Sequence, residues 1–191
     1  MQNVVKNWRL TDLHVALVEF RYTTPYPIQL ANAMGQLCHT TLILPYGASR
    51  FVHQLDQESV DLQFFHLPRY REPANLSMVW QLRRRLKAQR PDLLHITFRH
   101  WWGSPGLGLF SSDHVVATVH DVGPHPGDFS WWRNARIAYP FSWRWDDQVI
   151  VHSNADRQNL VSEDGCQPDR FQVIPIGPYD FYQVWARRDR Q

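Results

Sequence analysis

The residues best suited to acid–base chemistry stand at the end of a short apolar segment, Val115–His120 (VVATVH), where His120 is followed by Asp121. An imidazole titrates near neutral pH, so His120 could donate, accept or orient a proton beside the carboxylate of Asp121. The alternative is a histidine that local hydrogen bonds hold in place and that takes no part in chemistry. The residue types alone leave both interpretations open.

A second group of candidate residues follows the segment Asp92–Phe98 (DLLHITF). The group consists of Arg99, His100, Trp101 and Trp102. Adjacent indole rings stack well against a sugar or a lipid, and an arginine binds anions. The alternative is that one of the rings packs against the following helix. The residue types leave open whether at least one tryptophan lines a cleft.

The chain contains ten histidines, so a metal site has to be considered. Four of them belong to neighbouring segments: His95, His100, His120 and His125. They form neither H-x-x-x-H on a helix nor His-x-His on one strand, which are common pairs in metal sites. Alternation along its segment places His95 in the interior. We therefore expect no metal, and a metal-dependent hydrolase is the least favoured interpretation.

Bulk properties exclude several classes of protein. The chain has 191 residues, 43% of them hydrophobic, and a net charge of +2, which is too small for a nucleic-acid-binding surface. Cys38 and Cys166 match no metal spacing and suggest a reducing compartment. Residues 1–12 lack the apolar core of a signal peptide, and no apolar run approaches about 18 residues. We expect a cytoplasmic protein.

A regular alternation of elements must position the candidate residues. Short segments rich in β-branched residues predict strands at 13–20, 40–44, 60–67, 92–98, 115–120, 148–152 and 171–176. Amphipathic segments between them predict helices at 28–37, 49–57, 75–89, 132–141 and 155–163. This pattern indicates one α/β domain, with an open, mostly parallel sheet of about seven strands and helices on both faces. Ligands of such sheets bind beyond the carboxyl ends of the strands.

The loop after the first predicted strand, Arg21–Pro27 (RYTTPYP), contains no glycine. A dinucleotide-binding domain needs G-x-G-x-x-G at this place, so that the backbone can approach a pyrophosphate. Its absence argues against a nicotinamide or flavin enzyme. Tyr22, in the same loop, joins the candidate substrate contacts.

Four motifs in order resemble family 4 glycosyltransferases of the GT-B fold. Residues 91–96 (PDLLHI) resemble "PDvvHvH", and residues 116–121 (VATVHD) resemble "vvtvHD". Residues 147–153 (DQVIVHS) resemble "aDaviavS", and residues 170–180 (RFQVIPIGPYD) resemble "kvvvIPnGvD". Each motif is weak alone, whereas the four in order are specific. Upstream, residues 13–90 agree with the family only in their pattern of strands and helices.

The resemblance implies half of a two-domain enzyme. In this family the N-terminal Rossmann-like domain binds the acceptor, and a C-terminal domain with a Glu-x7-Glu motif binds the nucleotide-sugar. Here residues 13–180 match the first domain, residues 1–12 would be an N-terminal extension, and residues 181–191 the start of a linker or a tail. We therefore expect a donor-binding partner domain, and an inactive chain without it. The alternative is a non-catalytic binding or regulatory subunit of the same fold.

The family's site residues carry over only where the motifs match. His120 corresponds to the histidine that reaches the transferred sugar and the acceptor, Asp121 follows it, and Ser153 corresponds to a serine that can face the cleft. The expected reaction is retaining transfer from a nucleotide-sugar substrate, with no cofactor bound by this chain and usually without a metal. The chain departs from the family in lacking a glycine-rich loop after the first strand and in having Ile176 and Pro178 within "IPnGvD".

The predicted helix 75–89 carries a basic cluster of Arg83, Arg84, Arg85 and Lys87. Many family members act on lipid acceptors, and a basic amphipathic helix with a tryptophan suits an anionic membrane surface. A solvated helix face with no partner is the favoured interpretation. Contact with the inner face of the membrane remains the alternative.

Overall fold

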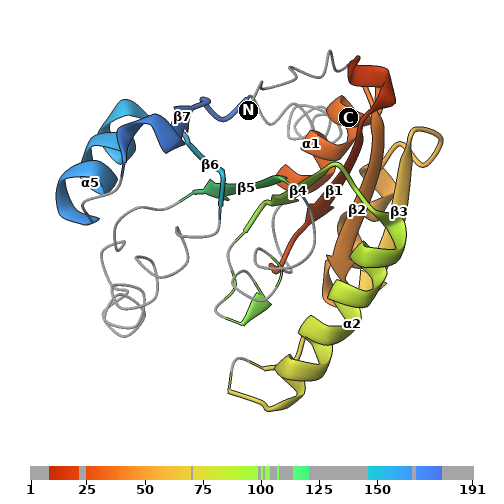
Figure 1. The fold of residues 1–191 in the computed structure, drawn as a ribbon. Coiled ribbons are helices and arrows are strands. Elements are labelled where there is room, and N and C mark those ends of the chain that lie inside the picture. The colour runs from red at the N-terminus through yellow and green to blue at the C-terminus, as the bar shows by residue number, and fades with distance from the viewer. Residues whose placement is uncertain are drawn as a thin grey trace, which may run out of the picture.

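The computed structural model describes residues 9–21, 25–69, 71–98, 100, 102–103, 107, 114–120, 146–164 and 167–177. Within them, a seven-stranded sheet has the order β3-β2-β1-β4-β5-β6-β7 (Figure 1). The strands are β1 (His14–Val18), β2 (His39–Pro45), β3 (Val60–Phe65), β4 (Leu93–Ile96), β5 (His114–Val119), β6 (Gln148–Val151) and β7 (Phe171–Val173). Every neighbouring pair is parallel, which confirms the predicted fold class.

Helices occupy most of the predicted connections. The described α-helices are α1 (Tyr26–Gly35), α2 (Ala74–Gln89) and α5 (Asn154–Asp164), and the 3-10 helices are η1 (Leu10–Asp12), η2 (Tyr46–Gln54) and η4 (Pro168–Arg170). The short helix predicted at 49–57 is the 3-10 helix η2, which begins at Tyr46, directly after β2, and ends at Gln54. The helix predicted at 132–141 lies outside the described residues.

Six of the seven strands end one to three residues earlier than predicted, and prolines lie near the ends of two of them, β3 and β7. β3 ends at Phe65, which pairs with Pro45, the last residue of β2. β7 ends at Val173, two residues before Pro175. Proline has no N–H to donate to a neighbouring strand, so the ladder stops near it.

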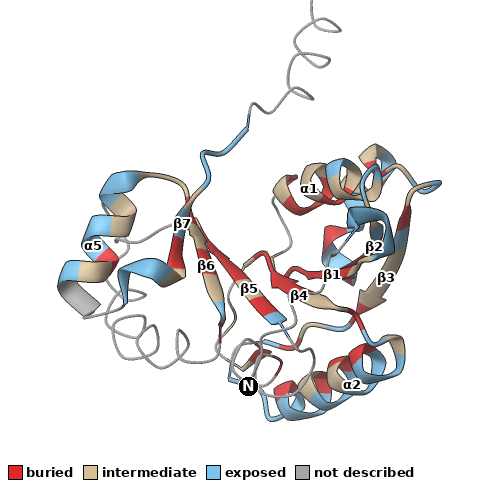
Figure 2. Ribbon diagram, turned by 45° about the horizontal axis from the view of Figure 1, so that its top comes forward, coloured by how far each residue is buried: buried red, intermediate tan, exposed pale blue. Residues whose placement is uncertain are grey.

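The two faces of the sheet are covered by different helices (Figure 2). In β1, Val15 and Leu17 pack in a cluster with α1 and η2, whereas Ala16 and Val18 pack in a cluster with α2. The change of face follows from right-handed crossovers that leave β1 in one direction and β4 in the other. The switch point therefore lies between β1 and β4, where ligands of open α/β sheets bind.

Helix α2 ends where Pro91 predicts, because Arg90 adopts a left-handed conformation (φ 49°) and its N–H donates to the carbonyl of Leu86. The sequence predicts an apolar side of this helix formed by Leu76, Val79, Trp80, Leu82 and Leu86, and this prediction is wrong in part. Leu76 and Trp80 are 62% and 59% exposed, and the buried apolar residues are Met78, Leu82 and Leu86. The two sets each repeat every four residues, so they follow separate stripes of the helix.

Two aspartates from the recognised motifs fasten the amino edge of the sheet. The N–H of Asp92 donates to the carbonyl of His14 (2.9 Å), and its Oδ2 accepts from the N–H of His14 (2.9 Å). Asp147 makes the same two bonds with Val115, at 2.8 and 2.7 Å. Each aspartate precedes one strand and bonds to the start of the parallel strand beside it, so these motif positions serve the fold.

Membrane-spanning helices are not found in the described part of the chain, where no helix is long and apolar enough to cross a bilayer.

Candidate functional site

A chain of hydrogen bonds runs across the carboxyl edge of the sheet. It starts after β1, where Glu19 Oε2 accepts from the hydroxyl of Thr97, at 3.0 Å. The Thr97 carbonyl, after β4, accepts from Nε2 of His120, which follows β5, at 2.9 Å. Nδ1 of His120 lies 3.1 Å from Nε2 of His152, which follows β6. Nδ1 of His152 then donates to the carbonyl of Ile174, after β7, at 2.9 Å.

The strands themselves place these residues side by side. The N–H of Glu19 donates to Ile43, that of Thr97 to Val18 and that of Ile174 to Val151, so backbone pairing continues just past three strand ends. The carboxyl ends of parallel strands meet at one edge of the sheet, so the residues that follow the strands lie in one row along this edge. The row includes the switch point between β1 and β4, so the site lies where the fold predicts a ligand.

Glu19 is a functional candidate that the sequence analysis missed. Its side chain is 1% exposed, and burial raises its pKa to about 7, against the hydrogen bonds from the N–H of Arg21 and the hydroxyl of Thr97. A carboxyl with such a pKa can hold or release a proton near neutral pH. The available signal was an acidic residue inside an otherwise apolar segment, 13–20 (LHVALVEF).

Two aromatic rings lie near His120. Tyr26 of α1 meets the His120 ring edge to face, with centroids 4.6 Å apart, and lies 5.9 Å from the ring of His152. Phe98 lies nearly parallel to His120 at 6.3 Å, and the guanidinium of Arg21 sits 3.7 Å from the centroid of Phe98. The imidazole therefore lies near two aromatic rings, one of which also contacts a cation. Sequence reasoning named neither Tyr26, Phe98 nor His152.

The loop after β4 turns its histidine inward. His100 stacks on Phe20 with centroids 5.1 Å apart, and its Nδ1 accepts from the N–H of Gly103 at 3.3 Å. Burial lowers the pKa of His100 to about 4, so the ring is neutral at physiological pH. A Cβ on Gly103 would lie 2.3 Å from the Phe20 ring, so this packing requires glycine. Trp102 is half-buried, whereas Arg99 and Trp101 lie outside the described residues.

Ser153 directly precedes helix α5. Its Oγ accepts from the N–H of Asp156 at 3.1 Å and donates to the carboxylate of Asp156 at 2.6 Å. The sequence offers Ser153 or Asn154 as the N-cap of this helix, and the hydrogen bonds identify Ser153. Its hydroxyl therefore bonds within its own helix turn. Two other predicted site residues, Tyr22 and Asp121, lie outside the described residues.

His95 lies in the interior, as alternation along its strand predicts. It is 4% exposed, and its Nε2 lies 2.8 Å from the hydroxyl of Thr118. Burial, and with it the neighbouring His120, lowers the pKa of His95 to about 4. Among the described residues, no three His, Cys, Asp or Glu side chains gather in a way that could hold a metal ion.

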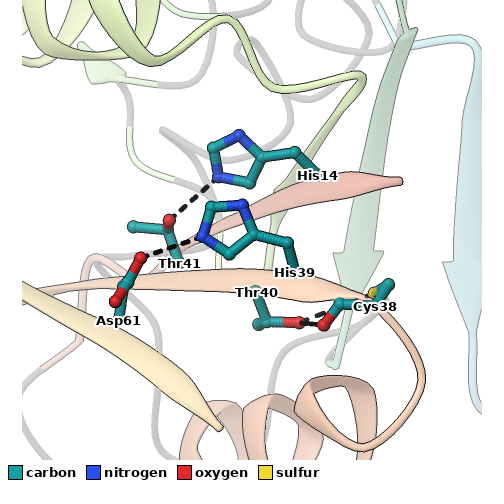
Figure 3. Close-up of polar contacts among 6 residues, drawn as sticks. All are labelled: His14, Cys38, His39, Thr40, Thr41 and Asp61. Carbon is teal, nitrogen blue, oxygen red and sulfur yellow. Dashed lines mark hydrogen bonds and ion pairs between the residues drawn. The ribbon is translucent and has the colours of Figure 1, made fainter. Parts of the chain in front are cut away.

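A second histidine pair lies on the opposite, amino edge of the sheet (Figure 3). The rings of His14 and His39 stack with centroids 4.1 Å apart and an interplanar angle of 21°. Nε2 of His39 lies 2.9 Å from Oδ2 of Asp61, and Nε2 of His14 lies 2.9 Å from the hydroxyl of Thr41. Burial, and next the charge of His39, lowers the pKa of His14.

The fold is shared with solved structures of longer chains. The chain superposes on a glycosyltransferase from Rickettsia africae ESF-5 with a TM-score of 0.61 and 16% identity, covering 94% of this chain and 50% of that one. It superposes on Anabaena HepE, solved with UDP and glucose, with a TM-score of 0.59 and 16% identity, covering 92% and 50%.

A UDP-GlcNAc 2-epimerase from Neisseria meningitidis, bound to UDP-GlcNAc, gives a TM-score of 0.65 at 11% identity, covering 93% and 51%. At such identities the likeness shows the fold alone. The chain spans about half the length of these structures.

Sequence comparison is more specific. None of the curated proteins matches the sequence. The model of Glycosyltransferase Family 4 matches residues 26–177, a stretch that begins at Tyr26 beside the two histidines and ends just after Ile174. Because this match covers most of the chain, including the elements that carry His120 and His152, the chain belongs to Glycosyltransferase Family 4.

Proposed function

We propose that this chain is the acceptor-binding half of a retaining glycosyltransferase, which moves a sugar from a nucleotide-sugar to an acceptor. The observation that carries the proposal is the row of polar groups at the carboxyl edge, centred on His120, within the family match. The proposal is also supported by the coverage of the matched structures, because this chain spans about half the length of each. A second, donor-binding domain would face this edge.

The proposed roles follow from where each side chain lies. His120 and its neighbour Asp121 would act at the transferred sugar. Both ring nitrogens of His120 are hydrogen-bonded within the chain, so a substrate hydroxyl would have to replace one of these bonds. We propose Arg99, Trp101, Trp102 and Tyr22 as acceptor contacts.

His100 and Ser153 are weaker candidates for contacts with the acceptor. The His100 ring stacks on Phe20, and the Ser153 hydroxyl bonds to Asp156, so either side chain would have to give up a bond or a packing contact to reach a substrate. We propose for them a supporting role, in which His100 shapes the loop after β4 and Ser153 starts α5.

The nucleotide-sugar is a substrate of the complete enzyme and would be held mainly by the partner domain. We therefore expect weak binding of UDP or GDP to this chain in isothermal titration, and sugar transfer only when the donor-binding domain is present on the same or another chain. The anomeric configuration of the product, read by NMR, should match that of the donor. An inverted product would contradict the retaining mechanism.

The same experiments address the alternative of a non-catalytic binding or regulatory subunit. Tight nucleotide binding by this chain alone would contradict the acceptor-half assignment. Acceptor binding without transfer, in the presence of a functional donor-binding domain, would favour the non-catalytic subunit.

We further propose that the outward side of α2 contacts an anionic membrane surface, which would place the protein at the inner face of the membrane. Leu76 and Trp80 are largely exposed, and the guanidinium of Arg84 lies 5.7 Å from the centroid of the Trp80 ring. Lys87 is also exposed, whereas Arg83 is half-buried. Apolar and basic side chains on one helix surface suit lipid headgroups.

Arg85 must be left out of the membrane test, because its Nη1 donates to the carbonyl of Phe64 at 2.6 Å. We expect an Arg84→Glu/Lys87→Glu variant to lose sedimentation with vesicles containing phosphatidylserine. The control, Arg9→Glu/Arg50→Glu, makes the same change of charge at exposed positions away from α2 and should sediment like the wild type. Equal sedimentation of all three proteins would contradict membrane contact through α2.

A further inference from the structure

The hydrogen bonds of His120 and His152 require more protons than two neutral imidazoles hold. A carbonyl oxygen only accepts, so Nε2 of His120 must carry a proton for Thr97, and Nδ1 of His152 must carry one for Ile174. The third bond joins Nδ1 of His120 to Nε2 of His152 at 3.1 Å, and one of these two nitrogens must also be protonated. Three of the four ring nitrogens therefore carry protons, whereas two neutral rings carry one each.

We propose that His120 and His152 form one unit that holds three ring protons, so that His152 is a positioning residue for His120 and the unit carries one positive charge. The extra proton lies between the two rings and belongs to either one. The role of His152 in sugar transfer rests on the proposed function, because it acts through His120.

The groups around the pair are compatible with one positive charge. From β4, His95 is held neutral by the burial that lowers its pKa to about 4, so it adds no second charge. From β1, the carboxyl of Glu19 is linked to the pair through Thr97 and favours the charged form when it is ionised. The guanidinium of Arg21, which lies on the ring of Phe98, disfavours a second positive charge nearby.

Among the described residues, a tyrosine ring and a carboxylate also lie near the pair. From α1, Tyr26 contacts both imidazoles through its ring. From the first turn of α5, Asp156 bonds to Ser153, the residue after His152. The aromatic contacts and the two carbonyl acceptors limit rotation of both rings, which keeps Nδ1 of His120 directed at His152.

His152 can orient His120 because its own ring is held in place. His152 is anchored by the carbonyl of Ile174, in the segment that leads out of β7. With that anchor in place, His152 keeps Nε2 of His120 protonated and its Nδ1 engaged. Any substrate group that takes up a bond to His120 meets a cationic unit, which favours an anionic partner such as a diphosphate oxygen.

The proton count can be measured on this chain without a substrate. Histidine side-chain nitrogen spectra, recorded by long-range 15N–1H NMR, distinguish protonated from unprotonated ring nitrogens. We expect three protonated nitrogens in the pair at the acid side of its titration, and a single shared midpoint for both rings as the pH rises. Two neutral rings over the whole range from pH 5.5 to 8, or two independent midpoints, would overturn the proposal.

A His152→Gln variant tests the coupling. A glutamine amide can donate to Nδ1 of His120 but cannot carry the charge, so we expect the His120 midpoint to move by about one pH unit or more. A His152→Phe variant removes the donor and should move the midpoint as well. An unchanged His120 midpoint in a folded variant would overturn the proposal, and the wild-type proton count decides the question if neither variant folds.

Failure of this inference is distinguishable from failure of the proposed function. Absence of sugar transfer would contradict the proposed function and leave the wild-type proton count unaffected. In a complete enzyme that transfers sugar, His152→Gln should shift the pH profile of kcat, which a purely structural residue would not do. A lowered kcat with an unshifted profile would overturn the positioning role.

Discussion

The two edges of the sheet carry two histidine pairs that differ in how the rings face each other. At the carboxyl edge, His120 and His152 meet nitrogen to nitrogen at 3.1 Å, and each also bonds to a carbonyl. At the amino edge, His14 and His39 stack face to face at 4.1 Å, and each bonds to its own oxygen partner. The two pairs therefore differ in the number of ring protons that their hydrogen bonds require. The first pair requires one more proton than two neutral imidazoles hold, and the second pair does not.

The two histidine pairs also differ in the ionisable groups that surround them. At the amino edge, Asp61 lies beside the ring of His39, and Asp92 accepts a hydrogen bond from the backbone N–H of His14. The carboxyl-edge pair ends a row that begins with Glu19, whose burial raises its pKa to about 7. Buried groups with shifted protonation cost stability and are typical of functional sites. The comparison therefore predicts that substitutions at the carboxyl edge change activity and those at the amino edge change little.

The largest expected effect is on catalysis. In the protein that includes the donor-binding domain, His120→Ala should lower kcat by about 10²–10⁴-fold, the usual cost of losing an acid–base or orienting group. His39→Ala, the matched change at the amino edge, should leave kcat within about twofold. Initial rates of sugar transfer and circular dichroism of both variants make the measurement. A His120→Ala enzyme within about twofold of the wild type would remove His120 from the mechanism.

The next effect is on stability and depends on pH. The pKa of Glu19 is raised on folding, from about 4.5 in the unfolded chain to about 7. The stabilisation that the protonated carboxyl gives the fold is therefore fully present below about pH 4.5 and is lost as the pH rises through about 7. Glu19→Gln keeps the shape without the charge. We expect the variant to be more stable than the wild type by about 1–3 kcal/mol at pH 8, and to have no such advantage at pH 4.5.

Urea unfolding at the two pH values measures the difference for Glu19. Glu58→Gln, which neutralises an exposed carboxylate, is the matched control and should change little at either pH. A Glu19→Gln variant that is destabilised at pH 8 would show that the ionised carboxyl stabilises the fold, and would make the carboxyl edge resemble the amino edge.

The sequence predicted the sheet because its strands are short, apolar and β-branched, and it predicted His120 because that residue ends such a segment. It did not predict the partners of His120. Tyr26 and His152 lie far from it in the chain, and only the strand order brings them together. His152 had been included in a predicted strand, where an exposed histidine is unremarkable. Side-chain orientation across neighbouring strands is a tertiary property that periodicity does not encode.

The same limit explains the helix that was predicted with too wide an apolar side. Trp80 and Leu76 are apolar, but the inward stripe of α2 is completed by Met78, Leu82 and Leu86. A hydrophobic residue next to such a stripe is ambiguous in the sequence, because only packing against the sheet decides which side turns inward.

The smallest expected effect concerns the amino edge. His39 and Asp61 are 55% and 67% exposed, and they form an ion pair only when the imidazole is protonated. Asp61→Asn should therefore destabilise the protein by no more than about 1 kcal/mol at pH 5, and by close to nothing at pH 8. Asp169→Asn, an exposed carboxylate on η4, controls for the change in net charge. If Asp61→Asn instead lowers the free energy of unfolding equally at pH 8 and pH 5, the carboxylate stabilises the stacked rings in their neutral form. That result would contradict this prediction.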